Sequence, residues 1–368
     1  MNTCFEEVKG TLGFGCMRLP MQENEVDFDE FSVMIDKFME AGFNYFDTAH
    51  GYVDEKSETA IRKCLTSRYP RESYLLTDKL SGNYFSKEED IRPMFESQLK
   101  ACGVDYFDFY LMHALGADGY PQYVNCRAFE VAMELKKEGK IRHIGMSFHD
   151  KAEVLDKILS EHPEVEVVQL QFNYIDYENP DIDSARCYQV CEKYNKPVIV
   201  MEPIKGGSLT QLPPEAGQIL DALGNDSYAS YALRFCASFP KIFMVLSGMS
   251  NLEQMKDNIH TMKDFVPFSE QEFAAVAQVS KVMASRSIVP CTGCRYCTAG
   301  CPMQISIPDL FAYYNDKTQY FGGDYNYMMK TADGGKASSC IQCGKCEAIC
   351  PQHLKIRELL VSVAKAFE

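Results

Sequence analysis

The chain has 368 residues, a formal net charge of −15 and no apolar run of the ~18 residues that a membrane-spanning helix needs. This length is too great for one average domain and fits a large domain joined to a small module. The acidic balance excludes nucleic acid as an expected partner, and the lack of a long apolar run excludes the membrane. The acidity belongs to the first part of the chain, because residues 287–368 hold eight Lys/Arg against seven Asp/Glu, whereas residues 1–286 hold 29 against 45.

Short apolar runs alternate with amphipathic stretches up to residue 265. The runs are apolar throughout, as expected of strands covered on both faces, and occupy residues 12–17, 43–49, 74–80, 106–113, 141–148, 165–173, 197–203 and 242–248. Helical spacing of apolar residues follows at residues 29–42, 57–68, 88–103, 129–140, 151–161, 183–196, 230–239 and 251–265. Eight strands alternating with eight helices predict an α/β fold and, by their number, a (β/α)8 TIM barrel. A doubly wound sheet is the alternative, but no G-x-G-x-x-G opens a helix after a strand.

The last part of the chain carries the same cysteine spacing twice. Eight of the 16 cysteines form two C-x2-C-x2-C-x3-C-P runs, namely Cys291, Cys294, Cys297 and Cys301, then Cys340, Cys343, Cys346 and Cys350. In bacterial ferredoxins with this spacing, the fourth cysteine of each run ligates the other cluster. The runs therefore predict two [4Fe–4S] clusters, one on Cys291, Cys294, Cys297 and Cys350, the other on Cys340, Cys343, Cys346 and Cys301. Zinc and disulfides are the alternatives, but zinc sites pair C-x2-C units across a longer loop, and nothing else suggests secretion.

Helical patterns surround the cysteine runs. Residues 268–285 lead into them, the segment between them has apolar residues at Ile307, Leu310, Phe311 and Tyr314, and an apolar helix at residues 354–367 follows. From about residue 290 the chain resembles the helical type of dicluster ferredoxin domain. We therefore predict a barrel over residues 1–286 and a small, mainly helical, ferredoxin-like domain over residues 287–368. Iron–sulfur clusters and abundant thiols indicate a reducing cytoplasm, in an organism that avoids oxygen. They are also compatible with a redox partner protein such as ferredoxin.

Polar residues end successive predicted strands of the barrel. Asp47 ends the second strand with Tyr52 on the following loop, Lys79 ends the third and His113 ends the fourth. Catalytic groups of such barrels lie at the C-terminal ends of the strands, so these four should converge at one mouth. A free tyrosine has a pKa of ~10, and a nearby ammonium lowers it. Tyr52 would then donate a proton while hydride reaches a carbonyl carbon, with Asp47 holding Lys79 and His113 orienting the oxygen.

Taken singly, these residues also fit ordinary roles. Asp47 would serve as a helix cap, Tyr52 as a surface aromatic residue and Lys79 as a solvated charge. Together, the segments LGFGCMRLP, FDTAHGY…SE, LLTDKL, DFYLMH, IGMS, VQLQFN, MEPIKGG and GMSNLEQMKDN resemble the aldo/keto reductase family over residues 11–265. The resemblance implies a catalytic tetrad of Asp47, Tyr52, Lys79 and His113. It also implies NAD(P)H bound in extended form across the barrel mouth, without a Rossmann fold.

The same resemblance implies a set of cofactor-binding residues. Ser147 and Gln169 would hold the nicotinamide carboxamide, and Met201 stands where many members place a stacking aromatic residue. The remaining implied contacts are Gly15, Cys16 and Met17 along the cofactor, Ile204, Gly206 and Gly207 at the pyrophosphate, and Ser250, Gln254, Asp257 and Asn258 at the adenosine end. Phe148 replaces a common Asn, and Gly248, Met249 and Gln254 stand where many members place a cation for the 2′-phosphate, so NADP(H) and NAD(H) both remain open.

Other polar residues have less specific interpretations. His50 and His149 fall near the predicted mouth and either contact substrate or form structural hydrogen bonds, and His143 has no assigned role. A metal held by His50, His113 and His149 lacks a ligand spacing that supports it. Cys187 and Cys191 are interpreted as small core residues. Substrate choice is expected to depend on residues 81–87 and 115–125.

Two functions follow from these features. The first is an NAD(P)H-dependent oxidoreductase that interconverts an aldehyde or ketone and its alcohol, with clusters that are structural or transfer electrons. Nicotinamide moves a hydride whereas a cluster moves one electron, and no flavin motif links the two. The alternative is a redox-sensing or electron-transfer protein whose barrel binds the nucleotide as a regulatory ligand.

Overall fold

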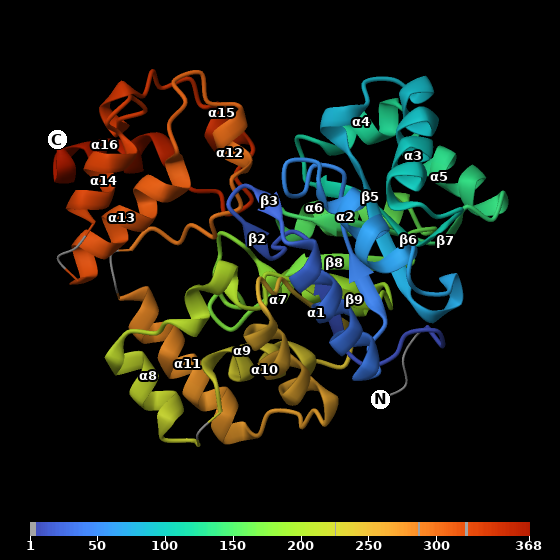
Figure 1. Ribbon diagram of the computed structural model, residues 1–368, viewed down its shortest axis with the longest axis horizontal. Helices are drawn as coiled ribbons and strands as arrows, with labels where there is room; N and C mark the ends of the chain where they lie inside the picture. Colours follow the sequence, from blue (N-terminus) through green and yellow to red (C-terminus); the bar gives the residue numbers. More distant parts are fainter. Residues whose placement is uncertain (1–4, 225, 286–287, 321–322) are drawn as a thin grey trace. The chain divides into compact units, whose positions relative to one another are not determined.

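The computed structural model describes residues 5–224, 226–285, 288–320 and 323–368. These residues form two compact units (Figure 1), one from residues 1–204 and 223–274, the other from residues 205–222 and 275–368. The segment at residues 205–222 thus belongs with the cysteine runs, although it follows a barrel strand. The predicted boundary between residues 286 and 287 lies outside the described residues.

The first unit contains a closed barrel of eight parallel strands, as predicted. The strands are β1 (Leu12–Gly15), β4 (Tyr45–Asp47), β5 (Leu75–Ser81), β6 (Phe107–Leu115), β7 (Ile141–Phe148), β8 (Val167–Gln171), β9 (Val198–Met201) and β10 (Ile242–Ser247). Each pairs with its neighbour in chain order, and β1 closes the barrel between β4 and β10. A hairpin of β2 (Met21–Gln22) and β3 (Glu25–Val26) follows β1.

Helices alternate with these strands. They are α1 (Phe28–Glu40), α2 (Ser57–Ile61), α3 (Glu88–Cys102), α4 (Tyr120–Asn125), α5 (Ala128–Lys137), α6 (Ala152–Glu161), α7 (Ser184–Lys193), α9 (Tyr228–Ala237) and α10 (Leu252–Lys263). The Asp27 side chain caps α1 by accepting from the amides of Asp29 and Glu30. The predicted helix at residues 57–68 is divided, because α2 passes into a π-helical turn at Arg62–Thr66. The expected loop at residues 115–125 contains α4.

The N-terminal segment closes the base of the barrel. Phe5 contacts Phe109, Phe243 and His143 with ring centroids 5.1, 5.1 and 4.6 Å apart. Phe109 and Phe243 lie near the starts of β6 and β10, so this end of the barrel is the N-terminal end of the strands. Phe5 belongs to a buried apolar cluster that also includes Val8, Tyr45, Leu75, Leu111, Val167, Ile199, Met244 and Leu246. Side chains therefore fill the barrel as a packed core.

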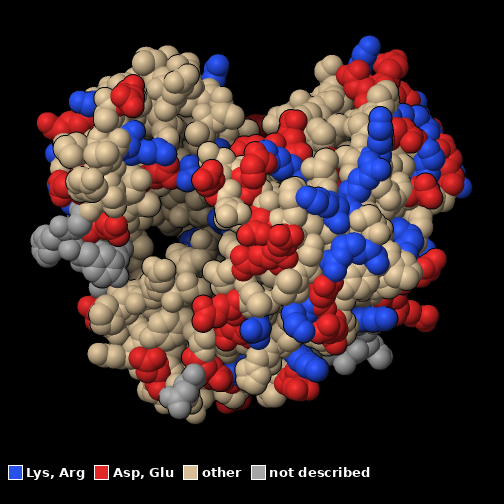
Figure 2. Space-filling view, viewed as in Figure 1, with Lys and Arg blue, Asp and Glu red and all other residues tan. Residues whose placement is uncertain are grey.

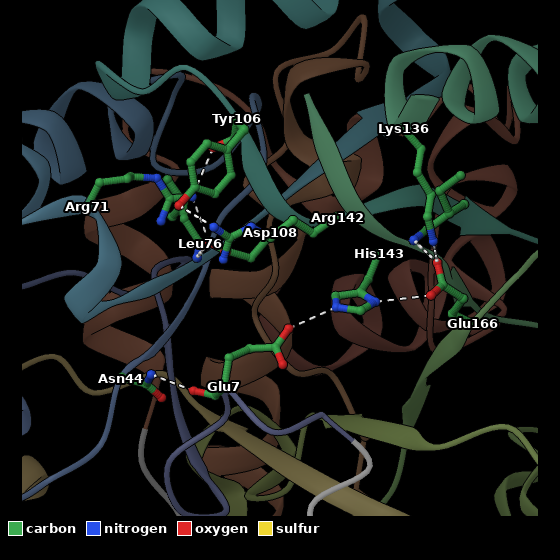
Figure 3. Close-up of polar contacts among 11 residues, drawn as sticks. Glu7, Asn44, Arg71, Leu76, Tyr106, Asp108, Lys136, Arg142, His143 and Glu166 are labelled. Carbon is green, nitrogen blue, oxygen red and sulfur yellow. Dashed lines mark hydrogen bonds and ion pairs between the residues drawn. The ribbon is translucent and has the colours of Figure 1, made fainter. Parts of the chain in front are cut away.

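Charged groups surround this base (Figure 3). His143 Nε2 lies 2.8 Å from Glu7 Oε1, and His143 Nδ1 lies 3.0 Å from Glu166 Oε2. Burial lowers the pKa of His143, but hydrogen bonds with Glu166 and Glu7 outweigh it, so the pKa lies above its ordinary value of 6.5. Glu7 thereby ties the N-terminal segment to β7, and Glu166 ties the start of β8 to β7.

A second group of charges joins three strands at the base. Buried Asp108 accepts hydrogen bonds from Arg71 at 2.7 Å, from Arg142 at 2.9 Å and from the Leu76 amide at 2.9 Å. Both guanidinium groups also lie over the ring of Tyr106, 3.8 and 4.2 Å from its centroid. The charge of Asp108 is thus fully partnered although its side chain is buried.

The second unit is helical. It contains η4 (Lys205–Thr210), α8 (Pro214–Asp221), the greater part of α11 (Glu270–Ala284), α12 (Tyr296–Ala299), α13 (Ile307–Tyr320), α14 (Asp324–Lys330), η5 (Ala337–Ser339), α15 (Lys345–Ala348) and α16 (Ile356–Phe367). Its core combines cysteines with apolar residues, among them Cys297, Cys346, Phe311, Leu310 and Val363. This mainly helical character agrees with the prediction.

The surface gives further information on charge. On the face shown in Figure 2, acidic side chains gather around β2 and β3, and basic side chains are interspersed with acidic ones elsewhere on the barrel unit. Among the described residues, no helix combines the length and hydropathy that crossing a membrane demands.

Candidate active site and cysteine cavity

The four residues predicted to form a tetrad lie together at the C-terminal ends of β4, β5 and β6. Lys79 Nζ donates to Asp47 Oδ1 and to the carbonyl oxygen of Thr48, both at 2.6 Å, and its side chain is fully buried. The same ammonium lies 4.8 Å from the centre of the Tyr52 ring. Burial raises the pKa of Asp47, while the Lys79 ammonium opposes this. The arrangement holds a cation beside a phenol.

His113 completes the group from β6. Its ring centre lies 6.0 Å from that of Tyr52, and Ser81 Oγ lies 2.6 Å from its Nδ1. Burial, Lys79 and His149 all lower its pKa well below 6.5, so the imidazole is neutral at neutral pH. Tyr123 OH donates to the carbonyl oxygens of His113 and Leu80, at 2.8 and 2.7 Å. Ser81 and Tyr123, which the sequence placed only in substrate loops, thus support His113 directly.

The predicted carboxamide residues lie on β7 and β8. Ser147 and Gln169 are register partners, and both side chains are buried. Gln169 Nε2 donates to Asp47 Oδ2 at 3.3 Å, and Ser147 Oγ accepts from the Ala114 amide at 2.7 Å. Met201 ends β9 opposite Gln171. The fold therefore links Gln169 to the Asp47–Lys79 pair and Ser147 to the end of β6.

The predicted cofactor residues at and after the end of β1 also lie at the C-terminal end of the barrel strands. Gly15 pairs with Asp47 in register, and Cys16 is fully buried, with its carbonyl oxygen accepting from Ser57 Oγ at 2.9 Å. Burial and then the Asp47 carboxylate raise the pKa of the Cys16 thiol. Met17 is partly buried. A buried, protonated thiol packs as a small apolar group and is not a nucleophile.

The proposed adenosine residues lie around the start of α10. The Ser250 amide donates to Gln254 Oε1 at 2.8 Å, and Asn258 Nδ2 donates to Ser247 Oγ at 2.8 Å. Asp257 accepts from Ser227 Oγ at 2.7 Å.

Arg18 is a cation that the sequence interpretation missed. A Cβ placed on Gly248 would lie 3.3 Å from the Arg18 side chain, and the Arg18 carbonyl oxygen accepts from Ser250 Oγ at 3.4 Å. Because Arg18 precedes Gly248 by 230 positions, no local motif signals this proximity.

The remaining predicted cofactor residues follow β9. Ile204 ends the segment of the first unit, whereas Gly206 and Gly207 belong to η4 in the second unit. Lys205, Gly206 and Gly207 have φ values of 48°, 65° and 97°, a left-handed run that glycine adopts readily. Successive amide N–H groups in turns of this kind form anion-binding concavities.

His50 connects to buried carboxyl groups beneath the tetrad. His50 Nδ1 lies 3.0 Å from Glu58 Oε2, and Glu58 is 1% exposed. Burial and then Glu58 raise the pKa of Asp78 well above its ordinary value, and Asp78 Oδ1 accepts from the Lys79 amide at 2.8 Å. Glu58 is the final residue of the FDTAHGY…SE segment, which could have signalled it. Within the described ranges, no three or more His, Cys, Asp or Glu side chains are grouped around a single ion position, and this includes His50, His113 and His149.

Cysteines of both runs line one cavity, in the combination predicted for one of the two crossed ligand sets. Cys301 of the first run and Cys340, Cys343 and Cys346 of the second line one cavity, which is partly open to solvent, together with Ile305, Ile307 and Leu360. Burial, followed by the nearby thiols of Cys294, Cys291, Cys350 and Cys346, raises the pKa of the Cys297 thiol to about 12. The four thiols of one predicted set thus line a single cavity, and the thiols of the other set lie near enough to Cys297 to affect its pKa. Thiols around an apolar cavity fit an iron–sulfur cluster.

An internal repeat positions these thiols. Residues related by 49 positions have equivalent backbones: α12 and α15 begin at Tyr296 and Lys345, and α13 and α16 begin at Ile307 and Ile356. Left-handed residues recur at the same offset, in the pairs Gly293 and Gln342, Arg295 and Gly344, and Gln304 and His353. The sequence showed only the repeated cysteines and prolines. The conformation repeats further, although the two members of each pair differ in residue type.

Comparison with known proteins identifies the families of the barrel and of the cysteine-rich segment. The aldo/keto reductase family matches residues 11–281, and the 4Fe-4S dicluster domain matches residues 290–354. An aldehyde reductase of Saccharomyces cerevisiae is 26% identical over 301 residues, 76% of this chain and 89% of that protein. The NADH-specific methylglyoxal reductase of Escherichia coli is 28% identical over 200 residues, 48% of this chain and 58% of that protein.

Solved structures agree on the fold. An aldo-keto reductase from Klebsiella pneumoniae in complex with NADPH superposes with a TM-score of 0.60 at 17% identity, covering 75% of this chain and 92% of that chain. The closed barrel and the family match over residues 11–281 lead to one conclusion. The chain belongs to the aldo/keto reductase family and is an NAD(P)-dependent oxidoreductase that carries a C-terminal 4Fe–4S dicluster domain.

Proposed function

We propose that the protein interconverts an aldehyde or ketone and its alcohol by hydride transfer, with Tyr52 as the general acid and base. The observation that best supports this proposal is the position of the buried Lys79 ammonium. Its Nζ lies 2.6 Å from Asp47 Oδ1 and 4.8 Å from the centre of the Tyr52 ring. A cation in this position favours the phenolate that remains after proton donation. An aldehyde reductase among the relatives supports the same substrate class.

The residues have distinct roles in this mechanism. A bound reduced nicotinamide supplies the hydride. Tyr52 donates its phenolic proton to the carbonyl oxygen, Lys79 stabilises the resulting phenolate, and Asp47 holds Lys79 in place. In the reverse direction the phenolate accepts the proton of the alcohol. Because Lys79 forms an ion pair with Asp47, the site suits a neutral carbonyl substrate.

His113 orients the substrate oxygen. Its Nδ1 is engaged by Ser81, which leaves Nε2 to face the substrate. When the Ser81 hydroxyl donates to Nδ1, the neutral ring carries its proton on Nε2 and donates a hydrogen bond to the carbonyl oxygen. The lowered pKa of His113 keeps the ring neutral, so it polarises the carbonyl without competing with Tyr52 as an acid.

The nicotinamide nucleotide is proposed to contact the residues that the family resemblance implies. Ser147 and Gln169 at the ends of β7 and β8 suit a carboxamide, and the left-handed run at residues 205–207 suits a diphosphate. We propose that Arg18 supplies the cation that Gly248, Met249 and Gln254 do not provide, which favours NADP(H). Replacing Arg18 with Gln should raise the KM for NADPH more than the KM for NADH, and equal changes would contradict this role.

The dicluster domain is proposed to hold two [4Fe–4S] clusters in the crossed sets described above. The cysteines Cys297 and Cys346 belong to the apolar core of their unit, which supports a structural role. Iron analysis should give about eight irons per chain. Cys294→Ser should lower thermal stability with little change in kcat at saturating nucleotide. A lost turnover at unchanged stability would instead favour electron transfer.

The proposed reaction is tested on purified, cluster-loaded protein. A panel of aldehydes and ketones is supplied with NADPH or NADH, and nucleotide oxidation is followed at 340 nm together with the alcohol product. Tyr52→Phe should abolish hydride transfer and leave the nucleotide Kd unchanged. Nucleotide binding without reduction of any carbonyl would favour the alternative of a redox-sensing protein.

A further inference from the structure

The left-handed run at residues 205–207 rests on one of the cysteine loops. A Cβ added to Gly206 would lie 2.4 Å from the carbonyl oxygen of Thr292 and 2.8 Å from its Cα, so the two backbones are in direct contact. Thr292 stands between Cys291 and Cys294. Only glycine permits this close approach, because any larger side chain would displace the loop.

A side-chain contact from the other run supports the same turn. The buried Lys205 donates from Nζ to Gln352 Oε1 at 3.4 Å, and Gln352 directly follows Cys350 and Pro351. Cys291, Cys294 and Cys350 belong to one crossed ligand set. Two loops that would hold the same cluster therefore contact consecutive residues of the turn.

The internal repeat shows that these contacts are particular to this cluster. Thr292 and Gln352 are buried, at 4% and 6% exposure. Their counterparts at the offset of 49 positions, Ile341 and Met303, are 59% and 37% exposed. The two halves of the repeat have the same backbone conformation. They differ in residue type and burial where the first half contacts the turn at residues 205–207.

We propose that Thr292 and Gln352 are positioning residues for nucleotide binding. The loops that hold the Cys291, Cys294, Cys297 and Cys350 set fix residues 205–207 in the conformation that receives the diphosphate of the nicotinamide nucleotide. This inference rests on the proposed function, from which the role of the turn is taken. It makes nucleotide affinity depend on the first cluster set and independent of the second.

Exchange of repeat counterparts tests the side-chain contact. In full-length, cluster-loaded protein, Gln352→Met places the counterpart residue beside Lys205, and Met303→Gln makes the reverse change in the other half. The Kd for NADPH is measured by fluorescence titration, and iron content and cluster absorbance are measured on the same samples. Gln352→Met should raise the Kd about three- to tenfold, the range for one ordinary hydrogen bond, because the contact of 3.4 Å is long, whereas Met303→Gln should leave the Kd unchanged.

A pair of glycine substitutions tests the backbone contact. Gly206→Ala and Gly207→Ala impose similar strain, since both residues have positive φ, but a Cβ on Gly207 would have no atom within 4 Å. Gly206→Ala should alter the electron paramagnetic resonance signal of the reduced first cluster and raise the Kd for NADPH at least tenfold. Gly207→Ala should leave that cluster signal unchanged.

The outcomes separate this inference from the function on which it rests. If Gln352→Met and Gly206→Ala keep the wild-type Kd with full iron content, the positioning role is wrong, while carbonyl reduction dependent on Tyr52 would still support the proposed reaction. If Gly206→Ala fails to fold, Gln352→Met decides the question alone. A wild-type protein that binds neither NADPH nor NADH would overturn both.

Discussion

The mouth and the base of the barrel each place a histidine within a set of charged side chains, with opposite results. At the mouth, burial and Lys79 keep His113 neutral, and the Lys79–Asp47 pair lies beside the Tyr52 phenol. At the base, His143 is held between Glu7 and Glu166, and its pKa is raised. Charges at the base therefore join chain segments, whereas we propose that charges at the mouth adjust a proton donor, Tyr52. The comparison assigns stability to one end of the strands and chemistry to the other.

The largest expected effect comes from Lys79 at the mouth. Lys79→Met should lower kcat by about 10²–10⁴-fold, because the phenolate loses its cation. It should also lower the free energy of unfolding by about 3–5 kcal/mol, because Asp47 stays buried without a counter-charge. The double variant Lys79→Met/Asp47→Asn should recover much of the stability and none of the activity. Activity that returned with stability would assign Lys79 to folding alone.

At the base, Asp108→Asn should act on stability alone. The neutral amide loses the charge-assisted hydrogen bonds with Arg71 and Arg142, so the free energy of unfolding should fall by about 2–3 kcal/mol. Urea unfolding measures this, with exposed Asp105→Asn as the control, which should change stability by no more than about 0.5 kcal/mol. The kcat of the folded Asp108→Asn protein should equal that of the wild type. A large loss of kcat would contradict the assignment of stability to the base and of chemistry to the mouth.

The histidine at the base predicts a dependence of stability on pH. Since the folded pKa of His143 is raised above 6.5, its contribution is complete below about pH 6.5 and is lost as the pH rises through the folded pKa. Burial works to raise the pKa of Glu166, but hydrogen bonds from His143 and Lys136 lower it to about 2. The carboxylate contribution is therefore present above about pH 4.5 and is lost as the pH falls through that value of about 2.

This contact is strongest between about pH 4.5 and pH 6.5. His143→Gln should therefore remove about 1 kcal/mol of stability at pH 6 and much less at pH 9. Thermal unfolding at both pH values compares the variant with the wild type. A difference that is the same at both pH values would show that His143 acts through packing with Phe5 and Phe109 instead of charge.

The smallest expected effect concerns Ser81 at the mouth. Ser81→Ala removes the hydroxyl that engages His113 Nδ1, so kcat should fall about three- to tenfold, the value of one neutral hydrogen bond. Ser81→Thr keeps the hydroxyl and should restore kcat. The nitrogen chemical shifts of His113, measured by NMR, report its tautomer directly. An unchanged tautomer in Ser81→Ala would show that another group orients the ring.

The barrel and the tetrad were accessible from the sequence because their signals are local. Strands covered on both faces are continuous apolar runs, and Asp47, Lys79 and His113 each lie at the end of such a run. The partners of these residues were less accessible. Ser81 was recognised only as part of a loop. Its hydrogen bond to His113 depends on the register between β5 and β6, and strand register cannot be read from the sequence.

By itself, the sequence determined the cofactor class and the order of the barrel strands, because cysteine spacing and apolar periodicity act over short stretches of chain. Only the tertiary structure decided that residues 205–222 belong with the cysteine runs and that His143 holds the N-terminal segment at the barrel base. Those results depend on contacts between distant residues, 147 positions apart for Lys205 and Gln352 and 136 for Glu7 and His143. Such contacts leave no periodic pattern, since they arise when packing brings together segments whose local sequences are unrelated.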